Sequence, residues 1–426
     1  MSDKTFEWPD SLWKATAAPL QRIEPLSEDI DTDLLIIGAG YTGLSTALHA
    51  IDAAGNVVVI DQAQPGWGCS GRNGGHINPQ WKTSVGRLQE LYAGNKFDQF
   101  VDTLDETARL VFDLIDRYNI DCNPVRSGSV IPGKGERGRK YLAEWSQFWR
   151  HYGADVELLD AAATKDMTGT SIYDFCMFDR RGGSVQPLSY ARGLAKACLG
   201  HGVSLFSETQ ALAVVRENNA WLVKTNKGQI RCHQVVIATN GYTGDLWPGL
   251  AQTIIPVASM LTATQPLSAD IANSILPGRQ AAAEYAGVPA YYRVDESNRL
   301  VFGWRGTLSG SIGRLDTSHL KSRAEKMFPA LKSVEWEYNW AGYVGITSHQ
   351  RPMLVKLGEN AFAGLGYNGR GITMATMMGK QLAQALNQER SSISMQTLEK
   401  VPFHRCYPVG VTARIAYGHF GDYFGV

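Results

Sequence analysis

The residues with the clearest chemical meaning are three glycines near the start of the chain. Gly38, Gly40 and Gly43 have the spacing GxGxxG and directly follow the apolar run 34–37. A strand, a tight turn and a helix start in this order bring free backbone N–H groups and the positive end of a helix dipole to a pyrophosphate. The spacing therefore predicts a dinucleotide-binding site.

An acidic residue follows where the ribose of a dinucleotide would lie. The apolar run 57–60 predicts a second buried strand, and Asp61 comes directly after it. A carboxylate at this place accepts hydrogen bonds from ribose hydroxyls and disfavours a 2′-phosphate, so NADP is not expected here. The alternative is a unit that binds no phosphate and whose glycines serve only close packing.

Charge and cysteine content argue against several classes of partner. The chain of 426 residues has 41 basic and 41 acidic side chains, which is not typical of a nucleic-acid or anionic-membrane surface. It contains no apolar stretch of membrane-spanning length, and residues 1–4 lead into no signal segment. The six cysteines lack a CxxC pair, which favours reduced thiols. We expect a cytoplasmic protein with small-molecule partners, no nucleic acid, no membrane and no metal.

Periodicity along the rest of the chain predicts an α/β fold. Apolar residues at helical spacing indicate helices over 85–118 and 139–153, and the run 235–238 indicates a buried strand. From 253 to 305 the pattern is typical of paired strands. We therefore expect a discontinuous Rossmann-like domain, with a second domain of antiparallel β-sheet plus helices lying over the dinucleotide.

The expected boundaries follow from this order, because the dinucleotide-binding segments are separated by other structure. We expect an N-terminal arm over 1–30 that packs on the body and a C-terminal tail over 391–426. The dinucleotide-binding domain is expected to comprise three segments, 31–84, 180–252 and 335–390. The substrate domain is expected to comprise two, 85–179 and 253–334.

Four stretches together resemble a known family. They are 33–43, the Gly-rich 68–75 (GCSGRNGG), 340–343 (WAGY) and 364–372 (GLGYNGRGI). With them the chain resembles the FAD-dependent amine and amino-acid oxidoreductases of the D-amino-acid-oxidase superfamily, which includes glycine and sarcosine oxidases. Within it, the chain is most similar to the gamma-glutamylputrescine oxidoreductase group. The second and fourth stretches together make the resemblance specific, and it covers nearly the whole length.

The resemblance implies oxidation of a carbon–nitrogen bond. Hydride would pass from the carbon beside the nitrogen to flavin N5, and the imine would then hydrolyse. Sarcosine oxidases attach flavin through a cysteine in the segment that matches 340–347; no cysteine lies there, so we expect non-covalent FAD. They also carry a lysine near N5, and the matching strand 300–303 has none. The acceptor is therefore left open as O2 or another electron acceptor.

The residues expected at the cofactor come from the glycine stretches and the strand ends. Arg72 would face the pyrophosphate or the flavin edge, and its alternative is a surface salt bridge. The full set is Gly38, Gly40, Tyr41, Thr42, Gly43, Asp61, Gln62, Ser70, Gly71, Arg72, Asn73, Gly74, Gly75, His76, Ala211, Thr239, Asn240, Gly366, Asn368, Gly369, Gly371 and Ile372.

Candidates for catalysis and substrate binding are fewer, and each has a structural alternative. His76 follows the Gly-rich loop and would lower the proton affinity of the amine, or be a hydrogen-bonded structural histidine. Tyr367 is the second catalytic candidate. Arginines on the β-rich strands, Arg293 and Arg305, would clamp a carboxylate or be solvated. The substrate candidates are Tyr292, Trp304, Arg305, Trp340 and Tyr367, with core packing as the alternative for the aromatic ones.

Three functions remain open from the sequence. The first is oxidation of a polyamine derivative or another secondary or primary amine. The second keeps the chemistry but acts on an amino acid or an N-methyl amino acid, and a carboxylate-binding arginine would favour it. The third is a regulator or scaffold that keeps FAD only for structure.

Overall fold

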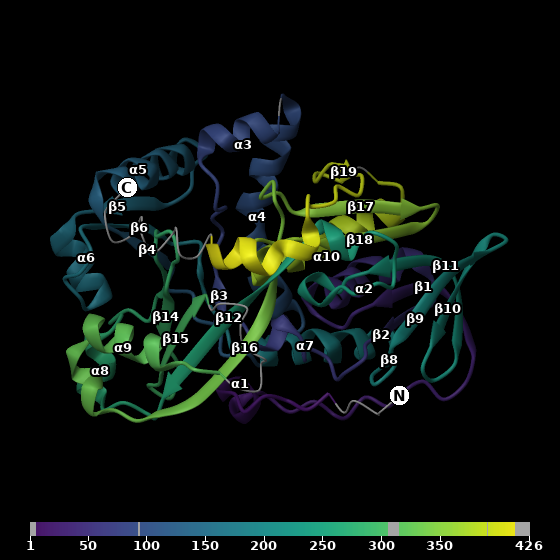
Figure 1. Ribbon diagram of the computed structural model, residues 1–426, viewed down its shortest axis with the longest axis horizontal. Helices are drawn as coiled ribbons and strands as arrows, with labels where there is room; N and C mark the ends of the chain where they lie inside the picture. The colour runs from purple at the N-terminus through teal and green to yellow at the C-terminus, as the bar shows by residue number, and fades with distance from the viewer. Residues whose placement is uncertain (1–5, 93, 306–314, 390, 414–426) are drawn as a thin grey trace.

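The computed structural model describes residues 6–92, 94–305, 315–389 and 391–413, with Arg305 described by its backbone alone. Two large β-sheets lie side by side, and helices cover them (Figure 1). The N-terminal arm carries a short helix, α1 (Leu12–Thr16), capped by the Ser11 hydroxyl, which accepts a hydrogen bond from Lys14 N. The arm packs on the body before the first strand begins at Ile30.

The first sheet is built around β1 (Ile30–Ile37), which pairs in parallel with β2 (Val57–Ile60) and β11 (Gln229–Ile237). Parallel strands that are covered on both faces consist of continuous apolar runs. The last four residues of β1 and all four residues of β2 are such runs, and all of them are buried. Beyond these strands lie β8 (Ser204–Phe206) on one side and β18 (Ala361–Leu365), β17 (Met353–Gly358) and β19 (Met395–Gln396) on the other.

The two faces of this sheet enter different hydrophobic clusters. Leu34 and Ile36 pack with the helices, whereas Leu35 and Ile37 pack on the opposite face with the hairpin of β9 (Ala211–Glu217) and β10 (Ala220–Thr225). The helices on the first face are α2 (Tyr41–Ala54), α4 (Asn95–Arg117), α7 (Pro187–Gly200) and α10 (Gly371–Leu386).

Close packing of α10 on α2 depends on a glycine. A Cβ added at Gly379 of α10 would clash with Ser45 of α2. Since both helices begin at the same edge of the sheet, this contact holds their N-termini together near the carboxyl ends of β1 and β18.

The second sheet has the order β16-β12-β15-β14-β13-β4-β6-β5. Two distant parts of the chain build it, joined where β13 pairs in parallel with β4. The strands are β4 (Ser129–Gly133), β5 (Val156–Leu159), β6 (Phe175–Asp179), β12 (Ile255–Thr264), β13 (Ala281–Ala283), β14 (Tyr291–Val294), β15 (Leu300–Arg305) and β16 (Trp336–Ile346).

Short elements complete the second layer and the connections. The helices are α3 (Val85–Leu91), α5 (Gly135–His151), α6 (Ala161–Thr168), α8 (Ala269–Ser274) and α9 (Ser318–Met327). A two-stranded ribbon of β3 (His76–Ile77) and β7 (Gly183–Ser184) and the 3-10 turns η1 (Cys69–Gly71), η2 (Asn240–Tyr242), η3 (Ala251–Thr253), η4 (Pro329–Ser333) and η5 (His404–Cys406) connect the layers.

The fold class confirms the sequence prediction, but sheet membership differs from the expected segments at two places. Strand β16 pairs with β12 in the second sheet, although 335–390 was expected in the dinucleotide-binding domain. Strand β19 extends the first sheet from within the expected tail. The helical region expected as 85–118 is divided between α3 and α4. The domain boundaries themselves stay a prediction.

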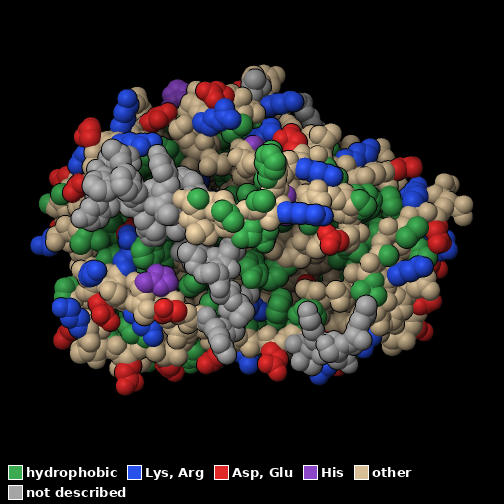
Figure 2. All heavy atoms as spheres, in the orientation of Figure 1, with side chains coloured by type: hydrophobic (Ala, Val, Ile, Leu, Met, Phe, Trp, Pro, Cys, Tyr) green, Lys and Arg blue, Asp and Glu red, His purple; other side chains and the backbone are tan. Residues whose placement is uncertain are grey.

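Charged side chains of both signs are interspersed over the face shown in Figure 2. This mixture agrees with the equal totals of acidic and basic residues. No helix in the described ranges is long and apolar enough to cross a membrane.

Candidate active site

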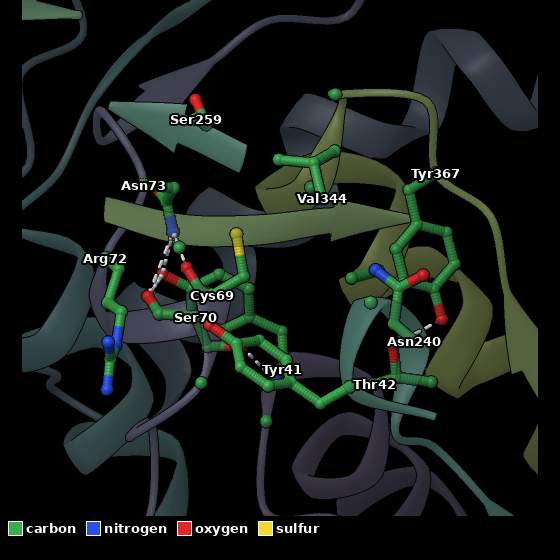
Figure 3. Close-up of a pocket in the computed structure, with 18 of the residues that line it drawn as sticks. Tyr41, Thr42, Cys69, Ser70, Arg72, Asn73, Asn240, Ser259, Val344 and Tyr367 are labelled. Atoms are coloured by element: carbon green, nitrogen blue, oxygen red, sulfur yellow. Dashed lines mark hydrogen bonds between the residues drawn. The ribbon is translucent and has the colours of Figure 1, made fainter. Parts of the chain in front are cut away.

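A large cavity of about 720 Å³ lies between the two sheets. One wall comes from the β1–α2 turn, the end of β2, the end of β11 and the start of α10. The other comes from β12, β14 and β16 of the second sheet, and the loop 66–76 closes one side. Figure 3 shows how side chains from these separate elements converge. Binding sites for cofactors have this size and often lie where strand ends open between layers.

The turn before α2 requires glycine at two of its three glycine positions, Gly38 and Gly43. Gly38 has φ +116°, and a Cβ there would lie 2.8 Å from Ala238 O. A Cβ on Gly43 would clash with Gly38 O, so this glycine lets the helix approach the strand. Gly40 is the N-cap of α2 and supplies no side-chain cap. The turn therefore combines close packing with an N-terminus open to an anion.

Asp61 fixes this turn from the end of β2. Its Oδ2 accepts a hydrogen bond from Ala39 N at 2.7 Å, and its Oδ1 accepts one from Ala63 N at 2.9 Å. Burial raises the pKa of Asp61 to about 6, although these two hydrogen bonds oppose the shift. The carboxyl group lines the cavity and keeps further lone pairs for a hydroxyl donor.

The loop 68–75 is held against α2 by a network around Asn73. Its Nδ2 donates to Tyr41 Oη at 3.2 Å and to the backbone oxygens of Cys69 and Ser70 at 3.0 and 2.9 Å. Its Oδ1 accepts from Gly75 N at 2.8 Å. Tyr41 Oη in turn donates to Ser70 O (Figure 3). The side chain of Asn73 thus shapes the loop, and the residue also lines the cavity.

Arg72 is buried, so the surface salt bridge is excluded as its role. Its Nε donates to Trp67 O at 2.7 Å and its Nη1 to Ala341 O at 3.3 Å, and the guanidinium lies 4.3 Å from the centroid of the Trp67 ring. Its Nη2 is buried and has no hydrogen-bond partner among the described residues. Arg72 lines the cavity, and this remaining donor fits an acceptor that the protein itself does not provide.

A second glycine turn leads from β18 into α10. Asn240 Oδ1 accepts from Gly366 N at 2.9 Å, and Asn368 Nδ2 donates to Gly366 O at 2.8 Å. The N-cap of α10, Arg370, provides no side-chain cap, and a Cβ on Gly371 would meet nothing within 4 Å. The cavity is therefore bordered by two helix N-termini whose N-cap residues supply no side-chain cap, although Ser70 Oγ accepts a hydrogen bond from Tyr41 N of α2 at 3.1 Å. The positive ends of the two helix dipoles suit a negatively charged ligand.

The predicted catalytic residues both line the cavity, and both have protein partners. Tyr367 Oη lies 2.6 Å from Thr42 Oγ1 and donates to Gly364 O at 2.9 Å, and burial raises its pKa. His76 Nε2 lies 3.0 Å from Ala282 O. Burial, and then the positive charge of Arg293, lower the pKa of His76 to about 4. The imidazole is therefore neutral at physiological pH and carries its proton on Nε2.

Three of the aromatic substrate candidates lie outside the cavity lining that the structure describes. Tyr292 and Trp340 are fully buried in hydrophobic clusters, and Trp304 donates from Nε1 to Val288 O at 2.6 Å. Tyr292 and Trp304 pack in the cluster on the far face of the second sheet, whereas Trp340 shares a face of β16 with the cavity-lining Gly342 and Val344 but packs against Trp13. These contacts agree with the core-packing alternative. Arg293 is buried too, and its guanidinium donates to the backbone oxygens of Gly74 and Val185. The side chain of Arg305 lies outside the described residues.

Most cofactor candidates converge on the cavity. The lining includes Gly38, Gly40, Tyr41, Thr42, Asp61, Gln62, Ser70, Arg72, Asn73, Gly74, His76, Ala211, Thr239, Asn240, Gly369, Gly371 and Ile372. The lining does not include Gly43, Gly71, Gly75, Gly366 or Asn368, whose contacts shape the turns behind it. The assignment of all these residues, lining or not, to the cofactor stays a prediction.

Sequence reasoning missed a group of lining residues at the end of the cavity beneath the second sheet. Tyr141 and Tyr285 place their ring centroids 4.7 Å apart, and Lys82 and Arg370 add positive charge. Arg370 Nε donates to Gln80 O at 2.6 Å. A signal for two of them was present, because Lys82 lies seven residues after the Gly-rich stretch 68–75 and Arg370 lies within the stretch 364–372.

Comparison with known proteins identifies the family. Residues 33–385 match the family described as FAD dependent oxidoreductase, abbreviated DAO. The chain is 30% identical over 418 residues to gamma-glutamylputrescine oxidoreductase of Escherichia coli (strain K12), covering 97% of both. It is 25% identical over 338 residues to sarcosine oxidase subunit beta of Rhizobium meliloti (strain 1021), covering 76% of both. The chain therefore belongs to the FAD-dependent oxidoreductases of the DAO family.

A solved structure supports the fold. The crystal structure of glycine oxidase from Geobacillus kaustophilus superimposes with a TM-score of 0.72 at 20% identity, over 85% of this chain and 96% of that one. Family membership makes the protein an oxidoreductase with FAD as its cofactor. The open helix N-termini, the glycine turns and the unpartnered Nη2 of Arg72 all fit a flavin dinucleotide in the cavity.

Proposed function

We propose that the protein oxidises a carbon–nitrogen bond of an amine that also carries a carboxylate, and that a gamma-glutamylated polyamine is the substrate class. The observation that carries the proposal is the chemistry of the cavity end beneath the second sheet, where aromatic rings and two basic side chains line the same space. The relative from Escherichia coli supports the same class by its name and its match over nearly the full length.

The two kinds of side chain suit the two parts of such a substrate. Tyr141 and Tyr285 form a tilted pair of rings that can pack along an alkyl chain. Lys82 and Arg370 supply the charge that a glutamyl carboxylate requires, and a guanidinium binds a carboxylate with directed hydrogen bonds. A substrate with a carboxylate at one end and an amine at the other fits this arrangement better than a plain diamine.

When bound, FAD accepts a hydride from the carbon beside the nitrogen. The chain must hold that amine without its extra proton, since the nitrogen lone pair helps to expel the hydride. Burial in the cavity disfavours the charged form of an amine. His76 adds no charge there, because its pKa is lowered to about 4, and its Nε2–H is held by Ala282 O.

An amino acid or N-methyl amino acid is the second candidate substrate. The same basic residues would hold its carboxylate, and the sarcosine oxidase relative is consistent with this chemistry. The two candidates differ in their apolar part: a gamma-glutamylated polyamine has an alkyl chain that can pack on the aromatic pair, whereas glycine and sarcosine have none.

An anaerobic panel separates these candidates. The holoenzyme is mixed without oxygen with gamma-glutamylputrescine, putrescine, sarcosine, glycine and several D-amino acids, and the flavin band near about 450 nm is followed. We expect the gamma-glutamylated amine to bleach it fastest. Fastest bleaching by an amino acid would favour the second candidate. A band that no compound bleaches would contradict both and leave FAD as a structural ligand.

We further propose that FAD is held without a covalent bond, because residues 340–347 contain no cysteine. Acid precipitation is expected to release all the yellow colour into the supernatant; colour that stays with the pellet would contradict this.

Readmitting air to the bleached enzyme tests which electron acceptor the protein uses. Reoxidation within the time of a turnover would identify O2, and slow reoxidation would indicate another acceptor.

A further inference from the structure

Three successive carbonyl oxygens in the Gly-rich loop are each bound from outside the loop. They belong to residues 72, 73 and 74, and each accepts one hydrogen bond from a buried side chain. The donors come from β16, from α1 in the N-terminal arm and from β14: Trp340 Nε1 to Arg72 O at 3.0 Å, Trp13 Nε1 to Asn73 O at 2.7 Å, and Arg293 Nε to Gly74 O at 3.0 Å.

The three donors also contact one another. The rings of Trp13 and Trp340 meet edge to face with centroids 5.7 Å apart, and the Arg293 guanidinium lies 4.9 Å from the centroid of the Trp13 ring. Their exposed fractions are 1%, 0% and 3%. Gln186 Nε2 holds Trp13 O at 2.8 Å, and Arg293 Nη2 donates to Val185 O at 2.9 Å. The donors therefore form one rigid group behind the loop.

This group determines which way the peptide N–H groups point. In a planar trans peptide the C=O of one residue and the N–H of the next point in opposite directions. With the three oxygens turned toward the buried donors, the N–H groups of Asn73 and Gly74 turn the other way. Both residues line the cavity, and neither N–H has a hydrogen-bond partner in the described part of the chain. The Gly75 N–H is taken by Asn73 Oδ1.

We propose that Trp13, Trp340 and Arg293 are positioning residues for FAD, which orient the loop so that the N–H groups of Asn73 and Gly74 donate to the cofactor. The N-terminal helix α1 is then part of the cofactor site, although it does not itself line the cavity. The inference needs only FAD binding and is independent of which amine is oxidised.

The variant Trp13→Phe tests it, because phenylalanine keeps an aromatic ring at Arg293 and Trp340 but lacks the donor for Asn73 O. We expect the dissociation constant of FAD, measured by the recovery of flavin fluorescence on dilution, to rise roughly tenfold. The matched control is Trp221→Phe, which loses a similar bond from Nε1 to Glu359 O at 3.0 Å in another part of the first sheet. The control is expected to lower the melting temperature and leave FAD affinity unchanged.

Unchanged FAD affinity in Trp13→Phe, or an equal loss in Trp221→Phe, would overturn the inference. If Trp13→Phe does not fold, amide hydrogen exchange on the unaltered protein decides the question. Adding FAD is expected to slow exchange at the amides of Asn73 and Gly74. Equal exchange with and without FAD would overturn the proposal. A protein that bound no FAD at all would instead contradict the family assignment.

Discussion

At the scale of single residues, His76 shows how the site keeps a titratable group uncharged. The ring borders the cavity, its Nε2 faces backbone oxygens of β13 and β14, and the Arg293 charge lies behind it. Burial and that charge both oppose protonation. The result is a neutral imidazole beside the cofactor loop at pH 7.

The lowered pKa of His76 predicts that the folded protein loses stability as the solution becomes more acidic. The pKa of His76 is near the ordinary histidine value of 6.5 in the unfolded chain but about 4 in the fold. Between these values the unfolded chain binds more protons, so the free energy of unfolding falls as the pH drops through this window, by up to roughly 3 kcal/mol. His76→Gln should remove that part of the loss. Urea unfolding at pH 7 and pH 5 measures it, and an identical pH dependence in both proteins would show that His76 is not the group.

A second prediction concerns Lys82 at the cavity end. Lys82→Met removes a charge proposed to bind the substrate carboxylate. We expect kcat/KM for gamma-glutamylputrescine to fall about tenfold, the usual scale for one charged hydrogen bond, while the already low value for putrescine changes little. The control Lys356→Met changes an exposed lysine on β17 and should affect neither. Equal losses for both amines would remove Lys82 from carboxylate binding.

At the scale of elements, the site depends on two helices that begin at the cavity and whose N-cap residues supply no side-chain bond. An ordinary N-cap is a Ser, Thr, Asp or Asn side chain. Here the N-caps are Gly40 for α2 and Arg370 for α10, and among the described residues only Tyr41 N of α2 is bound from elsewhere, by Ser70 Oγ. Backbone N–H groups without an acceptor destabilise the FAD-free fold, and a bound anion that accepts their hydrogen bonds offsets this loss.

The variant Gly371→Ala measures how fold stability and FAD binding depend on this helix start. A Cβ at Gly371 meets no protein atom within 4 Å, and the residue both begins α10 and lines the cavity. Gly371→Ala should therefore leave the FAD-free fold as stable or raise its free energy of unfolding by up to about 1 kcal/mol. It should nevertheless weaken FAD binding. Calorimetric melting and FAD titration give the two values, and unchanged affinity would mean that the cofactor does not approach Gly371.

The glycine turns could be predicted from sequence because their residue types are dictated locally. The side chains that face the substrate could not be predicted, because a shift of one residue along a strand moves a side chain from one face of the sheet to the other. Sequence reasoning chose Tyr292 of β14, but Tyr292 packs against Phe302 in the core. Its neighbour Tyr291 lines the cavity and lies 5.6 Å from His76, ring to ring.

At the scale of the whole molecule, the site exists only because distant parts of the chain meet. The segment 335–390 was expected in the dinucleotide-binding domain, but the sequence of β16 alone does not say that this strand pairs with β12 of the second sheet. The group of Trp13, Trp340 and Arg293 behind the loop was missed for a similar reason. Its members are far apart in sequence, and only the packed fold brings them together.

The most direct test of the account asks whether the cavity between the two sheets is the FAD site. Gly40 lines it, and a Cβ there would lie 2.9 Å from Ser70 Oγ, the acceptor for Tyr41 N, with no backbone atom among its nearest neighbours, so Gly40→Val is expected to fold with the loss of that one hydrogen bond. In a calorimetric titration with FAD, the FAD-free wild-type chain is expected to bind one equivalent and Gly40→Val none, with matching circular dichroism spectra. A folded Gly40→Val protein that binds FAD as tightly as the wild type would contradict the placement of the cofactor.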